Sequence, residues 1–213
     1  MHTRWLFLLL LGVVAFKSPA ATQDQESLDI YYIDVEGGAA TLFVSPSGQS
    51  MFVDSGHPGS VDAERIAAVV REVGLDEINY LVTTHYHLDH VGGAPELSAR
   101  VPSRNFVDHG LPTTPELDSN QPLYEAYLTT RETGRHIVVR AGDTIPIEGL
   151  DVKVVSSREE FITVPLVGND EPNPLCREFA PKEEILISGG ENGRSVGLVI
   201  QYGDVGQRAT GLF

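Results

Sequence analysis

Apolar residues in the first third of the chain fall into short runs that are interrupted by turn-forming residues. Residues 28–35, 40–44 and 51–53 are rich in β-branched and aromatic side chains, and Gly- or Pro-containing segments separate them. This pattern predicts strands joined by tight turns. Residues 78–83 form a largely apolar run without strict alternation, which is typical of a strand buried on both faces.

Helical periodicity appears between these strands. Apolar side chains recur at the i, i+3, i+4 and i+7 positions through Ile66, Val69, Val70 and Val73. With Asp62 as the N-cap and Gly74 just past the end, this spacing predicts a helix that begins at Asp62. Two further helices are expected at residues 94–99 and 122–133, the second one starting at a proline.

The remaining apolar runs complete a mixed α/β pattern. Strands are expected at residues 105–107, 136–139, 144–147, 150–155 and 196–202. Residues 157–184 are rich in Pro, Glu and Asn, so we expect a long loop there. A chain of 213 residues with this alternation predicts one α/β domain without internal repeats.

The N-terminal segment has the features of a signal peptide. Arg4 precedes an apolar run at residues 5–16 that is too short to span a bilayer comfortably, and small residues lead up to Ala20. We expect cleavage near Ala20, a hydrolase domain at residues 21–213, and a secreted or periplasmic protein without a membrane span. The alternative is an uncleaved anchor or a buried helix.

Charge and cysteine content narrow the classes of partner. Removing residues 1–20 takes away two basic residues, Arg4 and Lys17, and leaves 30 acidic against 13 basic residues, a net charge of −17. Such a field repels polyanions, so we expect a small-molecule or phosphoester substrate and no strong nucleic-acid binding. The one cysteine, Cys176, excludes an internal disulfide bond. The oligomeric state stays open.

Three of the seven histidines and an aspartate lie within six positions, directly after the buried run at residues 78–83. These residues are His85, His87, Asp89 and His90. Imidazole nitrogen and carboxylate oxygen are the ligands that Zn²⁺ prefers, with Mn²⁺ or Fe²⁺ as other candidates. In extended backbone His85 and His87 face the same way and suit one ion, whereas the adjacent Asp89 and His90 suit a second ion.

This cluster predicts hydrolytic chemistry. A bound metal ion lowers the pKa of its water from about 15.7 to about 7, so that hydroxide is available at neutral pH. Asp89 would then orient that water and accept its proton, which makes it the candidate catalytic residue. The alternative is a group of unrelated surface or core polar residues, and the dense spacing argues against it.

The motif His85-Tyr86-His87-Leu88-Asp89-His90, followed by Val91-Gly92-Gly93, resembles the His-x-His-x-Asp-His signature of the metallo-β-lactamase superfamily. Residues 53–56 resemble its Asp-x-Gly element and residues 141–152 resemble its later hairpin. The resemblance implies a four-layer αββα sandwich with one or two metal ions. Residues 33–40 and 192–199 also resemble hydrolase domains related to the competence protein ComEC, which implies phosphodiester chemistry.

Carried over by position, the resemblance makes His85 and His87 ligands of one metal ion and Asp89 and His90 ligands of a second, with Asp54 orienting a ligand. The superfamily's usual Pro-Gly-His turn is absent after residue 155. His109 is therefore a candidate for the missing ligand, or else a capped loop histidine. A bridging aspartate and a later histidine are also absent, because Asp204 follows the strand at residues 196–202 too soon. We expect a C-terminally incomplete domain.

These observations leave three functions in order of preference. The first is a secreted metal-dependent hydrolase that acts on an ester or phosphodiester bond with a metal-bound hydroxide. The second is a β-lactam or lactone hydrolase, which the missing Pro-Gly-His turn disfavours. The third is an inactive, truncated protein that binds a metal or a partner.

Overall fold

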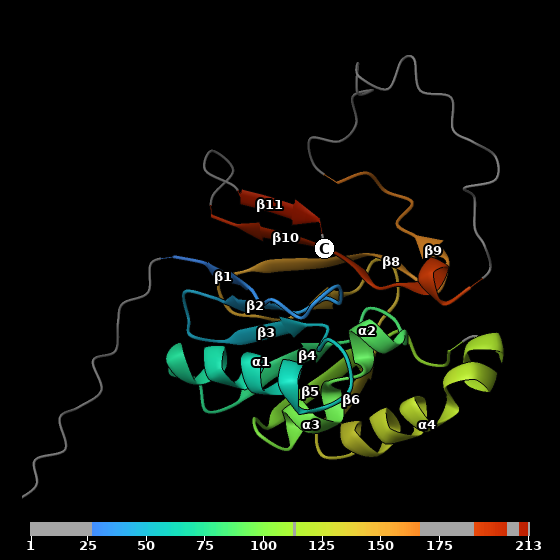
Figure 1. Cartoon of the computed structure of the whole chain (residues 1–213). Helices are drawn as coiled ribbons and strands as arrows, with labels where there is room; N and C mark the ends of the chain where they lie inside the picture. Colours follow the sequence, from blue (N-terminus) through green and yellow to red (C-terminus); the bar gives the residue numbers. More distant parts are fainter. Residues whose placement is uncertain (1–26, 113, 167–189, 204–208, 213) are drawn as a thin grey trace, which may run out of the picture.

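The computed structural model describes most of the chain beyond its first 26 residues (Figure 1). The described residues are 27–112, 114–166, 190–203 and 209–212. The predicted signal peptide at residues 1–20 lies outside them, as do Cys176 and Asp204. In the described part, no helix has both the length and the hydropathy needed to cross a membrane.

Six strands form the first sheet, in the same spatial order as in the sequence. They are β1 (Asp29–Tyr32), β2 (Thr41–Val44), β3 (Ser50–Val53), β4 (Ile78–Val82), β5 (Ser103–Asp108) and β6 (Arg135–Val138). Strands β1 to β3 pair antiparallel, whereas β3 to β6 pair parallel. The parallel half needs crossover connections, and helices supply them.

Four helices make these crossovers. They are α1 (Ser60–Glu72), α2 (Leu88–Val91), α3 (Ala94–Ser98) and α4 (Thr114–Arg131). Helix α1 joins β3 to β4, helices α2 and α3 join β4 to β5, and helix α4 joins β5 to β6. Apolar side chains of α1, such as Ile66 and Val70, pack against Leu42, Phe52 and Leu81 of the first sheet in one buried cluster.

The second sheet is antiparallel and lies over the first. It contains β7 (Thr144–Ile145), β8 (Asp151–Ser157), β9 (Glu160–Phe161), β10 (Gly197–Tyr202) and β11 (Ala209–Leu212). Its order is β11-β10-β8-β7, and β9 also pairs with β8. A second buried cluster fills the space between the sheets, including Phe43 and Val107 from the first sheet and Val152 and Leu198 from the second.

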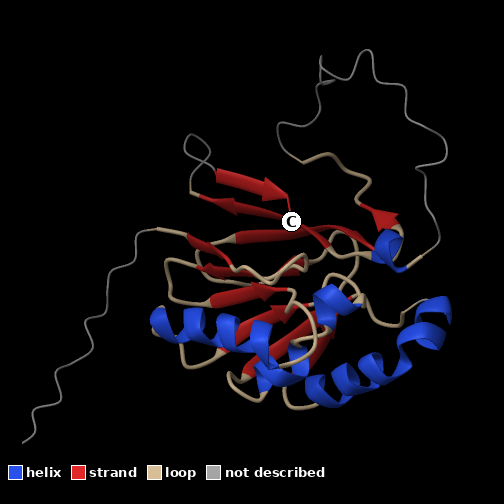
Figure 2. Ribbon diagram, in the orientation of Figure 1, coloured by secondary structure: helices blue, strands red, loops and turns tan. Residues whose placement is uncertain are grey.

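The mixed α/β architecture with two stacked sheets is confirmed. Figure 2 shows helices α1, α3 and α4 on the outer side of the six-stranded sheet. Within the described ranges, no α-helix covers the outer face of the second sheet. The N-terminal half of the sandwich therefore contains the helical layer, and the later strands close over its other face.

Two predicted helix starts were wrong. Helix α1 begins at Ser60, with Gly59 in the N-cap position. The Asp62 carboxylate instead accepts a hydrogen bond from the His57 backbone N–H, 2.9 Å away, so it ties down the preceding loop. Helix α4 begins at Thr114 and contains Pro122 in its interior, although proline is far more common in the first turn of a helix.

Short elements without a clear periodicity were also missed. Strand β9 lies within the loop predicted for residues 157–184, most of which falls outside the described residues. A 3-10 turn at Glu191–Arg194 precedes β10, and strand β11 follows it in the sequence. Both flank the one strand that was predicted in this part of the chain.

Candidate active site

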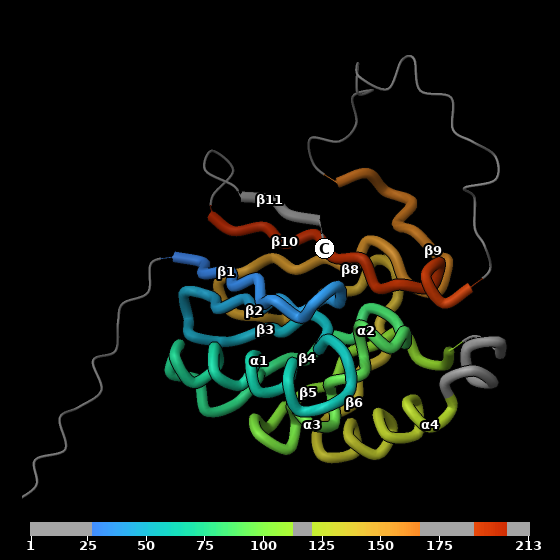
Figure 3. The backbone as a smooth tube through the Cα atoms, viewed as in Figure 1, coloured from blue at the N-terminus to red at the C-terminus, as the bar shows by residue number. Residues whose placement is uncertain are grey.

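The histidine motif and Asp54 meet at one edge of the first sheet. Asp54 directly follows β3, and the motif begins at His85, three residues after the last residue of β4, which is the parallel neighbour of β3. The carboxyl ends of parallel strands lie at the same edge of a sheet, which brings the two segments together. Figure 3 shows the connections that leave β3 and β4 side by side. A hydrogen bond of 2.7 Å from the Ser55 N–H to the His90 carbonyl joins them.

Asp54 is buried and holds two residues of the motif region at once. Its Oδ1 accepts the Thr84 backbone N–H at 2.8 Å, and its Oδ2 accepts the Thr84 hydroxyl at 2.7 Å. The same Oδ2 lies 2.8 Å from Nδ1 of His90. Its backbone φ of 60° is unusual for a residue other than glycine, and such backbone strain concentrates at functional sites.

These hydrogen bonds define which ring nitrogens carry protons. An ionised Asp54 only accepts, so Nδ1 of His90 donates to it, and in the neutral ring Nε2 keeps a free lone pair. The Thr84 hydroxyl also donates to Asp54, and it therefore accepts from Nδ1 of His85 at 3.0 Å. His85 thus also presents Nε2 as a lone pair, which is the state required of a metal ligand.

The four motif side chains come together in pairs. Nε2 of His85 lies 3.0 Å from Nδ1 of His87, and the rings of His85 and His90 have centroids 4.0 Å apart. Two nitrogen ligands of a tetrahedral Zn²⁺ are roughly 3.3 Å apart, since each Zn–N bond is about 2.0–2.1 Å. Nε2 of His85 accepts in this hydrogen bond, so Nδ1 of His87 carries the proton, and a cation bound by both nitrogens would take the place of the bond at nearly the same spacing. Asp89 lies next to His90, with Oδ2 3.5 Å from Nε2.

A complete metal-binding group is not present in the described part of the chain. Among those residues, no three His, Cys, Asp or Glu side chains form a group that could hold a metal ion. The motif side chains come together as two pairs, His85 with His87 and Asp89 with His90. Metal binding by all four residues stays a prediction.

Burial and neighbouring groups move the pKa of two motif histidines in opposite directions. Burial, together with the smaller effects of His90 and His87, lowers the pKa of His85 to about 4, although the charges of Asp54 and Glu191 act in the opposite direction. His85 is therefore neutral near pH 7. Burial also lowers the pKa of His90, but the hydrogen bond and the charge of Asp54, with a contribution from Asp89, outweigh this effect and raise it.

The His109 side chain contacts a buried carboxylate and the tyrosine of the motif. Its Nε2 is 2.7 Å from Oε1 of Glu191, and both side chains are wholly buried. Its ring packs against the Tyr86 ring, with centroids 4.6 Å apart. The structure thus gives His109 a carboxylate partner inside the protein, and its role as a metal ligand stays a prediction.

Glu191 is a residue of the site that sequence reasoning missed. Besides His109, its Oε1 accepts the backbone N–H of Tyr86 at 3.2 Å, in the middle of the histidine motif. Glu191 is separated from Tyr86 by 105 residues and stands in a short 3-10 turn. No local pattern marks a pairing over such a distance.

Glycines let the surrounding loops approach the motif closely. The N–H of Ala39 donates to the Asp89 carbonyl at 3.1 Å, and a Cβ on Gly38 would overlap that same carbonyl. A Cβ on Gly93 would overlap the carbonyl of Ser55. The β1–β2 connection and the segment after β3 therefore pack directly on the motif backbone.

A cavity of about 340 Å³ lies beside these side chains, between the two sheets. Its wall has polar members from the motif region and small or apolar members from both sheets. They are Ala39, Thr41, Val53, Asp54, Thr84, His85, His90, Ser195, Val196 and Gly197. No lysine or arginine is among these lining residues. The N–H of Val196 donates to the Thr84 carbonyl at 2.9 Å, which joins the second sheet to the motif.

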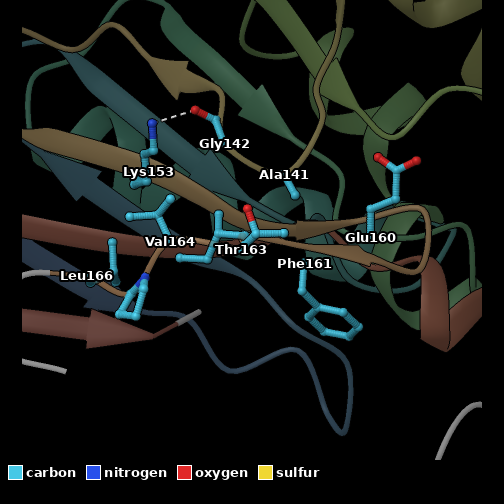
Figure 4. A pocket seen from close by; sticks show the side chains of 10 residues that line it. Ala141, Gly142, Lys153, Glu160, Phe161, Thr163, Val164 and Leu166 are labelled. Carbon is cyan, nitrogen blue, oxygen red and sulfur yellow. Dashed lines mark hydrogen bonds between the residues drawn. The ribbon is translucent and has the colours of Figure 1, made fainter. Parts of the chain in front are cut away.

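A larger cavity, of about 540 Å³, lies elsewhere on the second sheet. Figure 4 shows Lys153 and Phe161 among the residues that line it, with the Lys153 amine donating to the Gly142 carbonyl. Its lining contains no histidine and only one carboxylate, that of Glu160. We therefore assign the candidate chemistry to the smaller cavity at the histidine motif.

The chain belongs to the metallo-β-lactamase superfamily. The sequence profile of this superfamily matches residues 33–170, which include the histidine motif and Asp54. A curated relative, hydroxyacylglutathione hydrolase of Rhodopseudomonas palustris (strain HaA2), is 28% identical over 105 residues. That match covers 48% of this chain and 34% of the relative. The family and the relative indicate a hydrolase.

Solved structures show the same fold at low sequence identity. MEM-A1, a subclass B3 metallo-β-lactamase from a soil metagenome library, has a TM-score of 0.51 at 18% identity. FEZ-1 from Legionella gormanii has a TM-score of 0.53 at 13% identity. Both alignments cover 86% of this chain and 59% of the solved chain. The chain thus spans about a third of the curated relative and about three fifths of these solved proteins.

Proposed function

We propose that this protein is a metal-dependent hydrolase of small acyl compounds, such as esters and thioesters. One observation supports the proposal most directly. The facing nitrogens of His85 and His87, 3.0 Å apart, lie beside a cavity where Asp54 also holds His90 with its Nε2 lone pair free. Zn²⁺ is the cation that this set of donors favours, with Mn²⁺ or Fe²⁺ as alternatives.

Each residue has a separate part in this proposal. His85 and His87 would hold one cation, and Asp89 and His90 would hold a second one. A cation bound there supplies Lewis acidity toward water and toward the carbonyl oxygen of the substrate. Asp54 orients His90 through Nδ1, and the partly exposed Asp89 carboxylate accepts the proton that the attacking water loses.

The cavity wall supports an acyl substrate over a phosphodiester. A phosphodiester carries a negative charge, and sites for phosphate usually supply arginine or lysine in addition to metal. The described lining has neither, and the chain as a whole has a net charge of −15. The name of the curated relative, hydroxyacylglutathione hydrolase, also states an acyl substrate.

We also propose that the protein acts outside the cytoplasm. The support is the sequence of residues 1–20, with Arg4 before a short apolar run and small residues up to Ala20. N-terminal sequencing of protein from the extracytoplasmic fraction tests this proposal. We expect a mature chain that begins near Ala21, and an intact N-terminus retained in the cytoplasm would contradict it.

The enzymatic proposal is tested on the full chain after metal removal and reloading with Zn²⁺. Two chromogenic probes, 4-nitrophenyl acetate and bis(4-nitrophenyl) phosphate, separate acyl from phosphodiester chemistry. We expect zinc-dependent turnover of the acetate ester that His87→Ala abolishes. His57→Ala is the matched control, because His57 is a partly exposed histidine whose partner is Asp62 and which does not line the cavity.

Three outcomes would contradict the proposal. Faster turnover of the phosphodiester would replace the acyl assignment with phosphodiester chemistry. Equal activity of His87→Ala and wild-type protein would remove the histidine motif from the reaction. Failure to take up zinc would support the alternative of an inactive, partner-binding protein.

A further inference from the structure

Strand β1 carries two exposed apolar side chains at the edge of the first sheet. Tyr32 is 72% exposed and Ile30 is 40% exposed. The alternate residues Tyr31 and Ile33 pack against the buried cluster beneath the sheet. Strand β1 is therefore anchored through one face, while Ile30 and Tyr32 present apolar surface on the other face.

The strand register places Tyr32 in line with the candidate active site. Tyr32 pairs with Thr41 on β2, and Thr41 pairs with Val53 on β3. Directly paired residues in antiparallel strands point to the same face of a sheet. Thr41 and Val53 both line the cavity at the histidine motif, and Val53 immediately precedes Asp54. The Tyr32 ring thus belongs to the face of the sheet that forms the cavity wall.

The spacing between strands gives the distance that a ligand must span from the histidine motif to Tyr32. Neighbouring strands lie about 4.8 Å apart, so the Tyr32 backbone is roughly 5 Å from Thr41 and roughly 10 Å from Val53. Figure 1 shows β1 at the end of its sheet, next to β2. A substrate whose reacting bond lies at His85 and His90 needs an extension of roughly this length to contact Tyr32.

We propose that Tyr32, with Ile30 beside it, binds an extended apolar acyl group of the substrate. This inference depends on the proposed acyl hydrolysis and defines its substrate class as esters or thioesters of medium-length apolar acids. Thr41 and Val53 line the cavity, and their register places them between the histidine motif and Tyr32. The phenol ring contributes a broad apolar contact without the need for its hydroxyl.

The test compares 4-nitrophenyl octanoate with 4-nitrophenyl acetate, which share a leaving group and differ only in the acyl chain. Tyr32→Ala is expected to lower kcat/KM for the octanoate about five- to tenfold, mainly through KM, and to change the acetate less than about twofold. Tyr32→Phe is expected to retain wild-type kinetics on both esters. The matched control is Phe161→Ala, which removes a similarly exposed aromatic ring, 64% exposed, from the separate cavity on β9.

Several results would overturn the inference. They are an unchanged octanoate reaction in Tyr32→Ala, an equal loss on both esters, or a selective loss in Phe161→Ala. A dimer in light scattering that Tyr32→Ala converts to a monomer would assign the β1 edge to a second copy of the chain. If the zinc-loaded wild-type protein hydrolyses neither ester, the proposed function itself fails. If the wild-type protein hydrolyses the acetate ester but Tyr32→Ala changes neither reaction, only the inference about Tyr32 fails and the proposed function stands.

Discussion

Replacing Asp54 with asparagine should change the protonation of His90 while keeping most of the local structure. The asparagine Oδ1 can still accept the Thr84 N–H, which is 2.8 Å from the aspartate Oδ1. The new NH₂ group would stand where Oδ2 accepts Nδ1 of His90 at 2.8 Å. Two N–H donors cannot face each other, so His90 would accept at Nδ1 and move its proton to Nε2. The lone pair proposed for metal binding would then be lost.

We expect Asp54→Asn to weaken metal binding. Loss of a group that orients a histidine ligand typically weakens metal binding by about 10- to 100-fold, or about 1.4–2.8 kcal/mol. Calorimetric titration with Zn²⁺ measures this directly, and circular dichroism monitors the fold. Asp62→Asn is the matched control, because Asp62 is also a buried carboxylate that accepts a backbone N–H but lies outside the cavity. Wild-type zinc affinity in Asp54→Asn would refute the reasoning.

Two further predictions concern buried carboxylates. Glu191→Ala removes the acceptor of the buried His109 ring, so we expect the free energy of unfolding, measured by urea denaturation, to fall by about 3–5 kcal/mol. Glu191→Gln keeps an acceptor oxygen and should lower it less; equal decreases in the two variants would contradict the pairing. Burial raises the pKa of Asp108, but hydrogen bonds and charges from His136 and Arg131 outweigh this and lower it. The ionised Asp108 carboxylate therefore stabilises the folded protein above the ordinary carboxyl pKa of 3.8, and this contribution is lost as the pH falls through the lowered pKa of Asp108 in the folded state. In Asp108→Asn the free energy of unfolding should therefore depend less steeply on pH in the acidic range. An unchanged slope in that range would contradict the stabilising role of the Asp108 carboxylate.

Much of the fold follows from local patterns in the sequence. The apolar run at residues 78–83 and the periodicity of residues 66–73 correspond to β4 and to the buried face of α1. Helix starts were less predictable, because capping depends on which backbone groups remain unpaired after folding. Asp62 resembles an N-cap in sequence, yet its carboxylate is occupied by the His57 N–H. Pro122 resembles a first-turn residue, yet it lies inside α4.

The candidate site was predictable only where its residues are close in sequence or end neighbouring strands. The spacing of His85, His87 and His90 identified the cluster, and the resemblance to the metallo-β-lactamase superfamily implied the orienting role of Asp54. The pairing of His109 with Glu191 depends on how the second sheet closes on the first, and no local spacing encodes that closure. The placement of Tyr32 on the same sheet face as the cavity residues Thr41 and Val53 likewise depends on strand register, which is known only once the sheet is assembled.

The most direct test of the account is the zinc content of the purified chain. Protein dialysed against Zn²⁺ and then against metal-free buffer is analysed by mass spectrometry for metal per chain, in wild-type protein and in His87→Ala. We predict that the wild-type chain retains one to two zinc ions and that the variant retains clearly less. Absence of retained zinc in folded wild-type protein, or the same content in both proteins, would contradict the proposal that these side chains hold a divalent cation.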